Sequence, residues 1–515
     1  MRFQTLLMVL VVTVLPLAAC SHLQNGSDEE AVATLEQPNI VLIYMDDLGY
    51  GDLALYNAAA KIETPVISEL AEQGVVFTDA HSPSSVCTPS RYGLLTGRYA
   101  WRTWLKVGVL GGYSPPLIRQ DELTLMQWLK RRGYSTSMVG KWHLGFGDAE
   151  PDMSKFLTGF TDEPVEFTTD PGGGPNAVGF DYFFGLSASL DFPPYAFLEN
   201  GAYVDPPDRD IPERREGEYL DGLFYWRAGE IAPGFDFEQV EPILVRKAVQ
   251  QIEELSNGGQ PFFLYYASPA PHTPVLPTAD FHGASQAGEY GDFVAQTDHS
   301  VGLIVDALKR TGEWKNTILI FTSDNGAVHF SNLEEFGHVP NAPFSGQKSE
   351  LTEGGHRVPF IVTWPDKVRP RVSDDLVIQT DLFATIAELL GGSLAAKDAA
   401  DSFSFARALG LGATSGEARS SGVHHSLFGT FAYRKGNWKL VLDGQSGGYG
   451  SRYPELLEGK LPNPPRSTYR LYDLSADPTE QTDLAAEHPD LVDALAGELE
   501  AVRDAGYSRP GAEPL

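Results

Sequence analysis

The sequence predicts an α/β protein. A large, mixed, mostly parallel β-sheet is expected, with helices on both faces, followed by a smaller C-terminal α+β subdomain of antiparallel strands. Two observations predict this fold. Continuous apolar segments alternate with helix patterns from residue 38 to about 390, which is typical of parallel sheets buried on both faces. The chain of 515 residues is also too long for one small core and suits a large domain plus a smaller one.

The amino terminus, "MRFQTLLMVLVVTVLPLAAC", has Arg2 before an apolar run that ends at Leu17. The run is too short to span a membrane and indicates an export signal. Its end, "LAAC", resembles the lipobox of bacterial lipoproteins, in which Cys20 becomes lipidated; an ordinary signal peptide with a chance cysteine is the alternative. We therefore expect a protein in the periplasm or at the cell surface, held by a lipid anchor. The predicted segments are a signal peptide (1–20), a polar tether (21–37), a large domain (38–422) and a C-terminal subdomain (423–515).

The elements of the large domain follow from their apolar patterns. For the helix at 64–74, Thr64 is a capping residue, Pro65 suits the first turn and Gly74 ends it. Further helices are expected at 122–133, 291–312 and 381–392, and buried strands at 39–47, 134–145, 260–272 and 316–326.

The end of the chain has a different pattern. Strands are expected at 431–443 and 468–484, around Trp438 and Tyr472, and a terminal helix at 488–506. The preceding stretch, 391–422, is rich in Ala, Gly and Ser and is expected to be a linker with one short helix.

The chain is strongly acidic, with a formal net charge of −31. This charge argues against a nucleic-acid partner. It also means that an anionic substrate would have to be attracted by local cations rather than by the overall field.

Polar residues follow four of the predicted strands. Parallel strands end at one edge of a sheet, where binding sites gather, so these side chains are expected to meet. Carboxylate and amide oxygens suit Ca²⁺, with Mg²⁺ less favoured, and zinc is disfavoured because no His or Cys lies within the two acidic clusters. The residues are Asp46 and Asp47, Lys141 and His143, His272, and Asp324 and Asn325.

Cys87 lies in "SSVCTPSRYGLLTGRY", a Ser- and Pro-rich segment expected to be exposed. If Cys20 carries lipid, Cys87 has no disulfide partner, and an unpaired cysteine in an exported protein needs a reason. A helix is expected to begin just after Cys87, with its amino end offering N–H groups to an anion. The alternative is that Cys87 is a buried, inert core thiol.

The stretch "CTPSR", followed by "YGLLTGR", resembles the signature of type I sulfatases, members of the alkaline phosphatase-like superfamily. "NIVLIYMDDLGYGD", "GKWHLG", "GFDYFFG", "SPAPHTP", "TSDNG" and "EGGHRVPF" resemble the same family in the same order. The resemblance covers about residues 38–480 and includes the small C-terminal subdomain. It implies a sulfuric ester hydrolase whose Cys87 is oxidised to Cα-formylglycine by a maturation enzyme.

The resemblance also implies roles for individual residues. The hydrated aldehyde of residue 87 attacks sulfur, Arg91 steadies it, and His143 removes a proton to expel sulfate. His338 could line a substrate subsite, with a surface histidine as the alternative. His272 or Lys348 protonates the departing oxygen. Asp46, Asp47, Asp324, Asn325 and modified Cys87 are expected to hold Ca²⁺, and Lys141, His272 and Lys348 to neutralise sulfate.

The substrate follows less directly. Export, together with the aromatic residues of "SASLDFPPYAFLEN", favours a sulfated carbohydrate, although these aromatics could equally belong to the core. Two other functions stay open: a formylglycine-dependent phosphodiesterase or phosphonate monoester hydrolase, and a non-catalytic carbohydrate-binding lipoprotein.

Overall fold

A computed structural model of the chain describes residue 1 and residues 37–515, apart from 149–164, 169–171, 216–221, 331 and 413–417. Nearly all of the predicted signal peptide and of the tether lies outside the described residues. Within residues 37–515, a ten-stranded mixed sheet has the order β13-β2-β12-β11-β1-β10-β4-β5-β6-β7. Its strands are β1 (Asn39–Asp46), β2 (Val75–Phe77), β4 (Ser135–Lys141), β5 (Tyr182–Leu186), β6 (Leu198–Glu199), β7 (Ala202–Tyr203), β10 (Phe262–Pro271), β11 (Thr317–Ser323), β12 (Phe360–Thr363) and β13 (Arg371–Ser373).

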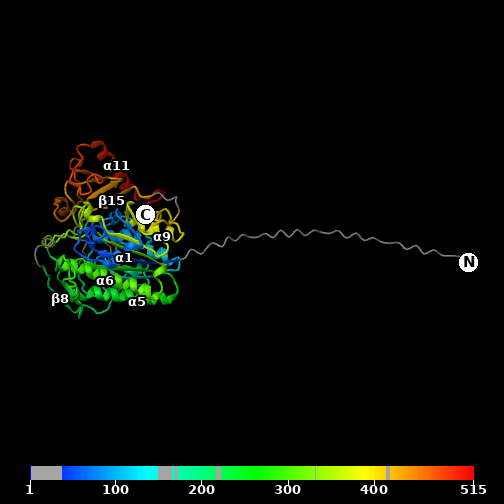
Figure 1. The fold of residues 1–515 in the computed structure, drawn as a ribbon. Helices are drawn as coiled ribbons and strands as arrows, with labels where there is room; N and C mark the ends of the chain where they lie inside the picture. Colours follow the sequence, from blue (N-terminus) through cyan, green and yellow to red (C-terminus); the bar gives the residue numbers. More distant parts are fainter. Residues whose placement is uncertain (2–36, 149–164, 169–171, 216–221, 331, 413–417) are drawn as a thin grey trace. The chain divides into compact units, whose positions relative to one another are not determined.

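Helices cover both faces of this sheet, which confirms the predicted class. Along β1, Ile40 and Leu42 belong to one apolar cluster and Val41 and Ile43 to the other, because successive side chains of a strand point to opposite faces. In Figure 1, α5 and α6 lie side by side along one side of the sheet, and α9 lies on the other. One face packs α1 (Pro65–Gln73), α5 (Val240–Gly258) and α6 (Gly288–Thr311), and the other α2 (Cys87–Thr96), α3 (Leu125–Lys130) and α9 (Leu382–Leu389).

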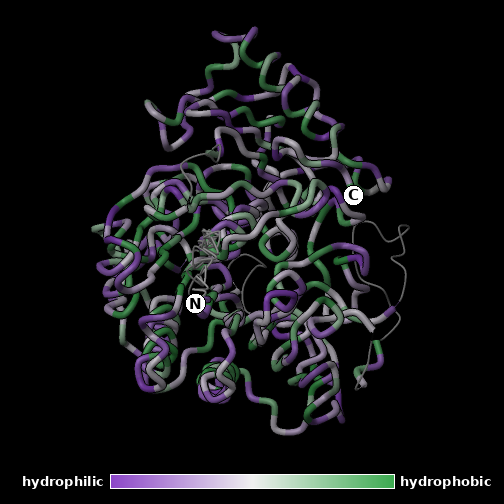
Figure 2. Tube along the Cα trace, turned by 90° about the vertical axis from the view of Figure 1, so that its right-hand side faces the viewer, coloured by the Kyte–Doolittle hydropathy of each residue, from purple (hydrophilic) through white to green (hydrophobic). Residues whose placement is uncertain are grey.

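Figure 2 shows hydrophobic segments running through the body and hydrophilic ones frequent at its periphery. Among the described residues, no helix is long and apolar enough to cross a membrane.

The start of α1 shows how tertiary contacts replace a local signal. Thr64 occupies the N-cap position, as predicted, but its side chain makes no capping bond. Instead the carboxylate of Asp298, on α6, accepts hydrogen bonds from the backbone N–H groups of Val66 and Ile67, at 3.2 and 2.8 Å. The free N–H groups of this helix are therefore satisfied by its neighbour.

The C-terminal part forms a separate antiparallel sheet. Its strands are β15 (Ser421–His425), β16 (Phe431–Lys435), β17 (Trp438–Val441) and β18 (Arg470–Asp473). Helix α11 (Pro489–Ala505) packs on β16 and β17. The short helix expected between 391 and 422 is wrong for the described residues there, which form turns and irregular chain. Its Gly and Ser content favours turns over helix.

The sheet register confirms that the strand ends converge. Strand β1 is parallel to β10 and β11, with Tyr44 opposite Ala267 and Thr322, and Asp46 opposite Pro271. Strand β4 is parallel to β10, so Lys141 reaches the same edge. The polar residues that follow these strands therefore share one edge.

Buried histidines from the large domain pack against a histidine of the C-terminal sheet. His356 and His424 stack with ring centroids 3.8 Å apart, and His81 Nδ1 lies 3.0 Å from His356 Nδ1. Burial, together with the nearby charges of His81 and Lys439, holds the pKa of His424 well below its usual value. Arg434 bonds to Asp79, and Lys439 bonds to Glu353. His424 is thus kept neutral within a network of fixed charges.

This cluster predicts acid sensitivity. Below pH about 6.5 the unfolded chain binds a proton at residue 424 that the folded protein does not, so the contribution of His424 to the free energy of unfolding falls with falling pH. We expect the melting temperature of wild type to fall more steeply between about pH 7.5 and 5.5 than that of His424→Asn. His488→Asn, a change at an exposed histidine, is the control. Equal slopes for wild type and His424→Asn would contradict the prediction.

Candidate active site

Two aspartates lie at the end of β1, and cations surround them. Asp46 Oδ2 accepts a 2.6 Å hydrogen bond from Lys141 Nζ, and Asp47 Oδ1 lies 2.8 Å from Lys348 Nζ. Burial disfavours the charge of Asp46, but Lys141 and other cations outweigh it and lower the pKa of Asp46. Asp47 has a backbone φ of 64°, in the left-handed region, a strain often found at functional sites.

The residues after β11 complete a group of oxygen donors. Asp324 Oδ1 accepts a hydrogen bond from the N–H of Asp47 at 3.2 Å, and its Oδ2 accepts one from Arg91 Nη2 at 2.8 Å. Asn325 Nδ2 donates to Asp47 Oδ1 at 2.7 Å, whereas the buried Asn325 Oδ1 has no hydrogen-bond partner among the described residues. The structure therefore brings together four of the five residues expected to bind Ca²⁺, the fifth being Cys87.

Cys87 is the first residue of α2, where the chain enters the helix from extended Val86. Its Sγ is 3.5 Å from Asp46 Oδ1. The expected exposure of this segment is wrong, since Cys87 is 2% exposed and Arg91 is fully buried. The reason is that α2 packs against one face of the sheet, next to α3 and α9. Burial raises the pKa of the Cys87 thiol far above its usual value.

His143 follows β4 with a φ of 60°. Its Nε2 lies 2.7 Å from the carbonyl oxygen of Leu110. A carbonyl only accepts, so Nε2 carries the hydrogen and Nδ1 has the lone pair. Nδ1 is buried with no partner among the described residues. Burial, with the charges of Lys141 and Arg91, holds the pKa of His143 well below its usual value, so the ring is a neutral acceptor.

His272 comes directly after β10. Its Nδ1 lies 2.6 Å from the carbonyl oxygen of Thr273, which assigns a hydrogen to Nδ1. Its Nε2 lies 3.7 Å from Asp47 Oδ2. The nitrogen that faces the site is therefore Nε2.

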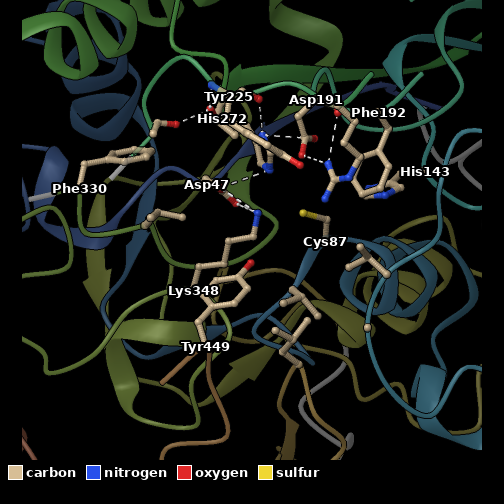
Figure 3. A pocket seen from close by; sticks show the side chains of 18 of the residues that line it. Asp47, Cys87, His143, Asp191, Phe192, Tyr225, His272, Phe330, Lys348 and Tyr449 are labelled. Atoms are coloured by element: carbon tan, nitrogen blue, oxygen red, sulfur yellow. Dashed lines mark hydrogen bonds and ion pairs between the residues drawn. The ribbon is translucent and has the colours of Figure 1, made fainter. Parts of the chain in front are cut away.

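These residues border a pocket of about 170 Å³. Figure 3 shows Lys348 and Asp47 opposite Cys87, with His272 above them. The predicted residues on its wall are Asp47, Cys87, His143, His272 and Lys348. Asp46, Arg91, Lys141, Asp324 and Asn325 lie buried around them. Lys141 Nζ contacts Asp46 and Ser189 Oγ, so the structure does not place it on the wall, although it was expected to contact substrate.

His338 requires a correction. It is 1% exposed, and its Nε2 lies 2.7 Å from Asp52 Oδ1. Asp52 also accepts hydrogen bonds from Tyr290 and from the backbone of Gly49. His338 therefore supports the loop after β1, and it is neither a surface residue nor part of the pocket wall.

Several pocket residues were not predicted. Asp191, Phe192, Tyr225 and Arg227 line one wall, and Tyr449 reaches the pocket from the C-terminal subdomain. Only the aromatic stretch 187–200 offered a signal. It proves mixed, since Phe192 lines the pocket and Tyr195 packs against Phe237 in the interior. Arg227 and Tyr449 lie in loops without a recognisable pattern.

The fold and the site define a class: a hydrolase of anionic esters with an α/β fold and with a cysteine at a helix amino end between carboxylates and cations. A family model described as Sulfatase matches residues 38–393. The chain belongs to the sulfatase family and is a sulfuric ester hydrolase.

Individual relatives extend the similarity over most of the chain. The N-acetylgalactosamine-6-O-sulfatase of Bacteroides thetaiotaomicron is 37% identical over 507 residues, covering 91% of this chain and 93% of that protein. Arylsulfatase A of Homo sapiens is 32% identical and covers 90% and 87%. A solved structure described under glycosaminoglycan metabolism by Bacteroides thetaiotaomicron matches with TM-score 0.77 and 34% identity, covering 91% of this chain and 100% of that one.

The alternative hydrolase receives no specific support. A phosphonate monoester hydrolase of Agrobacterium radiobacter matches with TM-score 0.56 and 18% identity, covering 91% of this chain and 95% of that one. At this identity the match reflects the shared fold alone.

Proposed function

We propose that this protein is an exported sulfatase that removes 6-O-sulfate from N-acetylgalactosamine units of sulfated oligo- or polysaccharides. The observation that carries the proposal is that Cys87, Asp47, His143, His272 and Lys348 all border the same pocket. The 37% identity to an N-acetylgalactosamine-6-O-sulfatase, over nearly the whole of both chains, supports the sugar and the sulfated position.

The donor set fits Ca²⁺. Asp46, Asp47, Asp324 and Asn325 would hold the ion, since hard oxygen ligands suit this cation. The unpartnered Asn325 Oδ1 is an acceptor that a cation would satisfy. Cys87, which lines the pocket close to Asp46, would be present as formylglycine. Together these groups would supply an oxygen nucleophile for sulfur and a positive charge beside it.

The chain's own residues would bind and orient the sulfate. Lys348 reaches the pocket wall, where its ammonium can neutralise sulfate oxygens. Lys141 lies behind the pocket wall, and its ammonium holds Asp46 in place through a hydrogen bond. Arg91 fixes Asp324 through two hydrogen bonds and also donates to the carbonyl of Lys141 at 3.1 Å. It thus ties α2 to the ends of β4 and β11.

Two histidines would handle protons. His272 keeps one hydrogen on Nδ1 for Thr273, so a protonated His272 would present a second one at Nε2 to the departing alcohol oxygen. Lys348 stays the alternative acid, although two short contacts with Asp47 restrain its ammonium. His143 Nδ1, which is neutral and buried, would accept the proton whose removal releases sulfate.

Export and a lipid anchor at Cys20 remain part of the proposal and rest on the sequence motif. Cys20 lies outside the described residues. Fractionation of cells that express wild type and Cys20→Ala would test the anchor: wild type should sediment with membranes and the variant should not.

Substrate preference is tested by comparison of kcat/KM on a 6-O-sulfated N-acetylgalactosamine oligosaccharide, its 4-O-sulfated isomer, an aryl sulfate and a phosphate diester. We expect the first to be preferred over its isomer by ~10²-fold or more, since a misplaced sulfate cannot reach both the nucleophile and the acid. Preference for the phosphate diester would show that the protein is instead a phosphodiesterase.

A further inference from the structure

Asp191 places a carboxylate on the wall of a pocket that is otherwise suited to an anion. It is 3% exposed. Its Oδ2 accepts a hydrogen bond from Arg227, while its Oδ1 has no hydrogen-bond partner among the described residues. A buried polar atom without a partner is costly. We therefore expect a bound ligand to supply the hydrogen-bond donor that Asp191 Oδ1 lacks.

The position of Asp191 is rigid. Its backbone carbonyl accepts hydrogen bonds from the hydroxyl of Tyr195 and from the backbone N–H of Arg227, each at 3.2 Å. Arg227 in turn lies over the ring of Phe192, with Cζ 3.7 Å from the ring centroid. The free oxygen is thus held at a defined point, as a specificity contact requires.

The charge of Asp191 determines what it can bind. Burial opposes ionisation, but the charges of Arg227 and His272 outweigh it and lower the pKa of Asp191. An ionised carboxylate is only an acceptor and repels sulfate. It must therefore face the alcohol part of the ester, which offers hydroxyl donors.

Geometry places this contact next to the ring of His272, the proposed acid. Asp191 Oδ1 lies 4.0 Å from His272 Nδ1, and His272 Nε2 lies 3.7 Å from Asp47 Oδ2. The imidazole ring thus separates the free oxygen from the proposed cation site. In Figure 3, Asp191 lies between His272 and Phe192.

We propose that Asp191 Oδ1 accepts a hydrogen bond from a free hydroxyl of the substrate close to its sulfated carbon. Asp191 thereby selects sulfate esters of sugars over esters that lack this hydroxyl or carry it methylated or sulfated. The inference rests on the proposed carbohydrate sulfatase function and adds a specificity residue to it.

The test is a cycle of protein and substrate changes. Wild type and Asp191→Asn are assayed on a 6-O-sulfated N-acetylgalactosamine glycoside, on its deoxy analogues at each ring hydroxyl, and on 4-nitrophenyl sulfate. The amide retains an oxygen for Arg227 but cannot offer a second acceptor. We expect kcat/KM on the glycoside to fall by ~10–10²-fold, the cost of one hydrogen bond to a charged group. One deoxy analogue should lose the same factor with wild type and little more with the variant, whereas 4-nitrophenyl sulfate should be unaffected.

Glu230→Gln is the matched control. It removes one negative charge at an exposed position, where Glu230 accepts a hydrogen bond from Tyr113, and should leave all substrates unchanged. Equal losses on the glycoside and on 4-nitrophenyl sulfate would show that Asp191 only supports the catalytic groups and would overturn the inference, as would unchanged kcat/KM. Wild type that cleaves 4-nitrophenyl sulfate but no sulfated sugar would refute the proposed function, and the inference with it.

Discussion

A Cys87→Ala variant is expected to hydrolyse sulfate esters at least ~10⁴-fold more slowly than wild type, the scale of effect seen when a catalytic nucleophile is removed. Cys87 lies at the amino end of α2, against Asp46 and on the pocket wall. As an unmodified thiol it would be a poor nucleophile, because burial raises its pKa. Active protein should therefore carry formylglycine at this position, and activity should scale with the modified fraction.

Mass measurement of the peptide that contains residues 87–91 tests this, with parallel assays of preparations matured to different extents. Cys87→Ser should at best become sulfated once without turnover, unless the host can oxidise serine. Because the folded protein buries Cys87, unmodified protein should resist later maturation until it is unfolded. Full turnover by protein whose Cys87 is entirely thiol would contradict the mechanism.

An Asp324→Asn variant is expected to lose ~10³-fold in kcat, since it weakens both the proposed cation site and the ion pair that positions Arg91. Alanine is the less informative change. Arg91 and Asp324 are both fully buried, and removal of one partner leaves an unpaired buried charge at a cost of about 3–5 kcal/mol. Asparagine keeps the shape and one acceptor oxygen for Arg91, and Asp46 Oδ1, 3.8 Å from Arg91 Nη2, remains as a counter-charge, so the variant should fold.

Calcium binding gives a readout that does not depend on turnover. Added Ca²⁺ should raise the melting temperature of chelator-treated wild type, and this shift should be small in Asp324→Asn. Asp121→Asn is the control, because Asp121 pairs with Arg119 at the surface. Stoichiometric zinc in the purified protein, or full activity after thorough chelation, would rule out the calcium assignment.

The sequence was sufficient for the fold class and for the residues that meet at the strand ends. Apolar runs such as that of β1 identify buried strands by themselves, and the parallel register then places Asp46, Lys141, His272 and Asp324 at one edge. These inferences succeed because they depend on local patterns and on a general rule of parallel sheets. The expected short helix before β15 is absent from the described residues there, because no such periodicity supports it.

What local patterns could not reveal are contacts between segments far apart in the chain. The carboxylate of Asp298 caps α1 in place of Thr64, His338 bonds to Asp52, and Asp191 pairs with Arg227. The sequence by itself determined the fold class and the residues that follow the strands. Only the tertiary structure decided which of them line the pocket. Only it decided which nitrogen of His143 and of His272, and which oxygen of Asp191, has no hydrogen-bond partner among the described residues. Burial and hydrogen bonding depend on neighbours that the fold brings together, and chain order does not specify those neighbours.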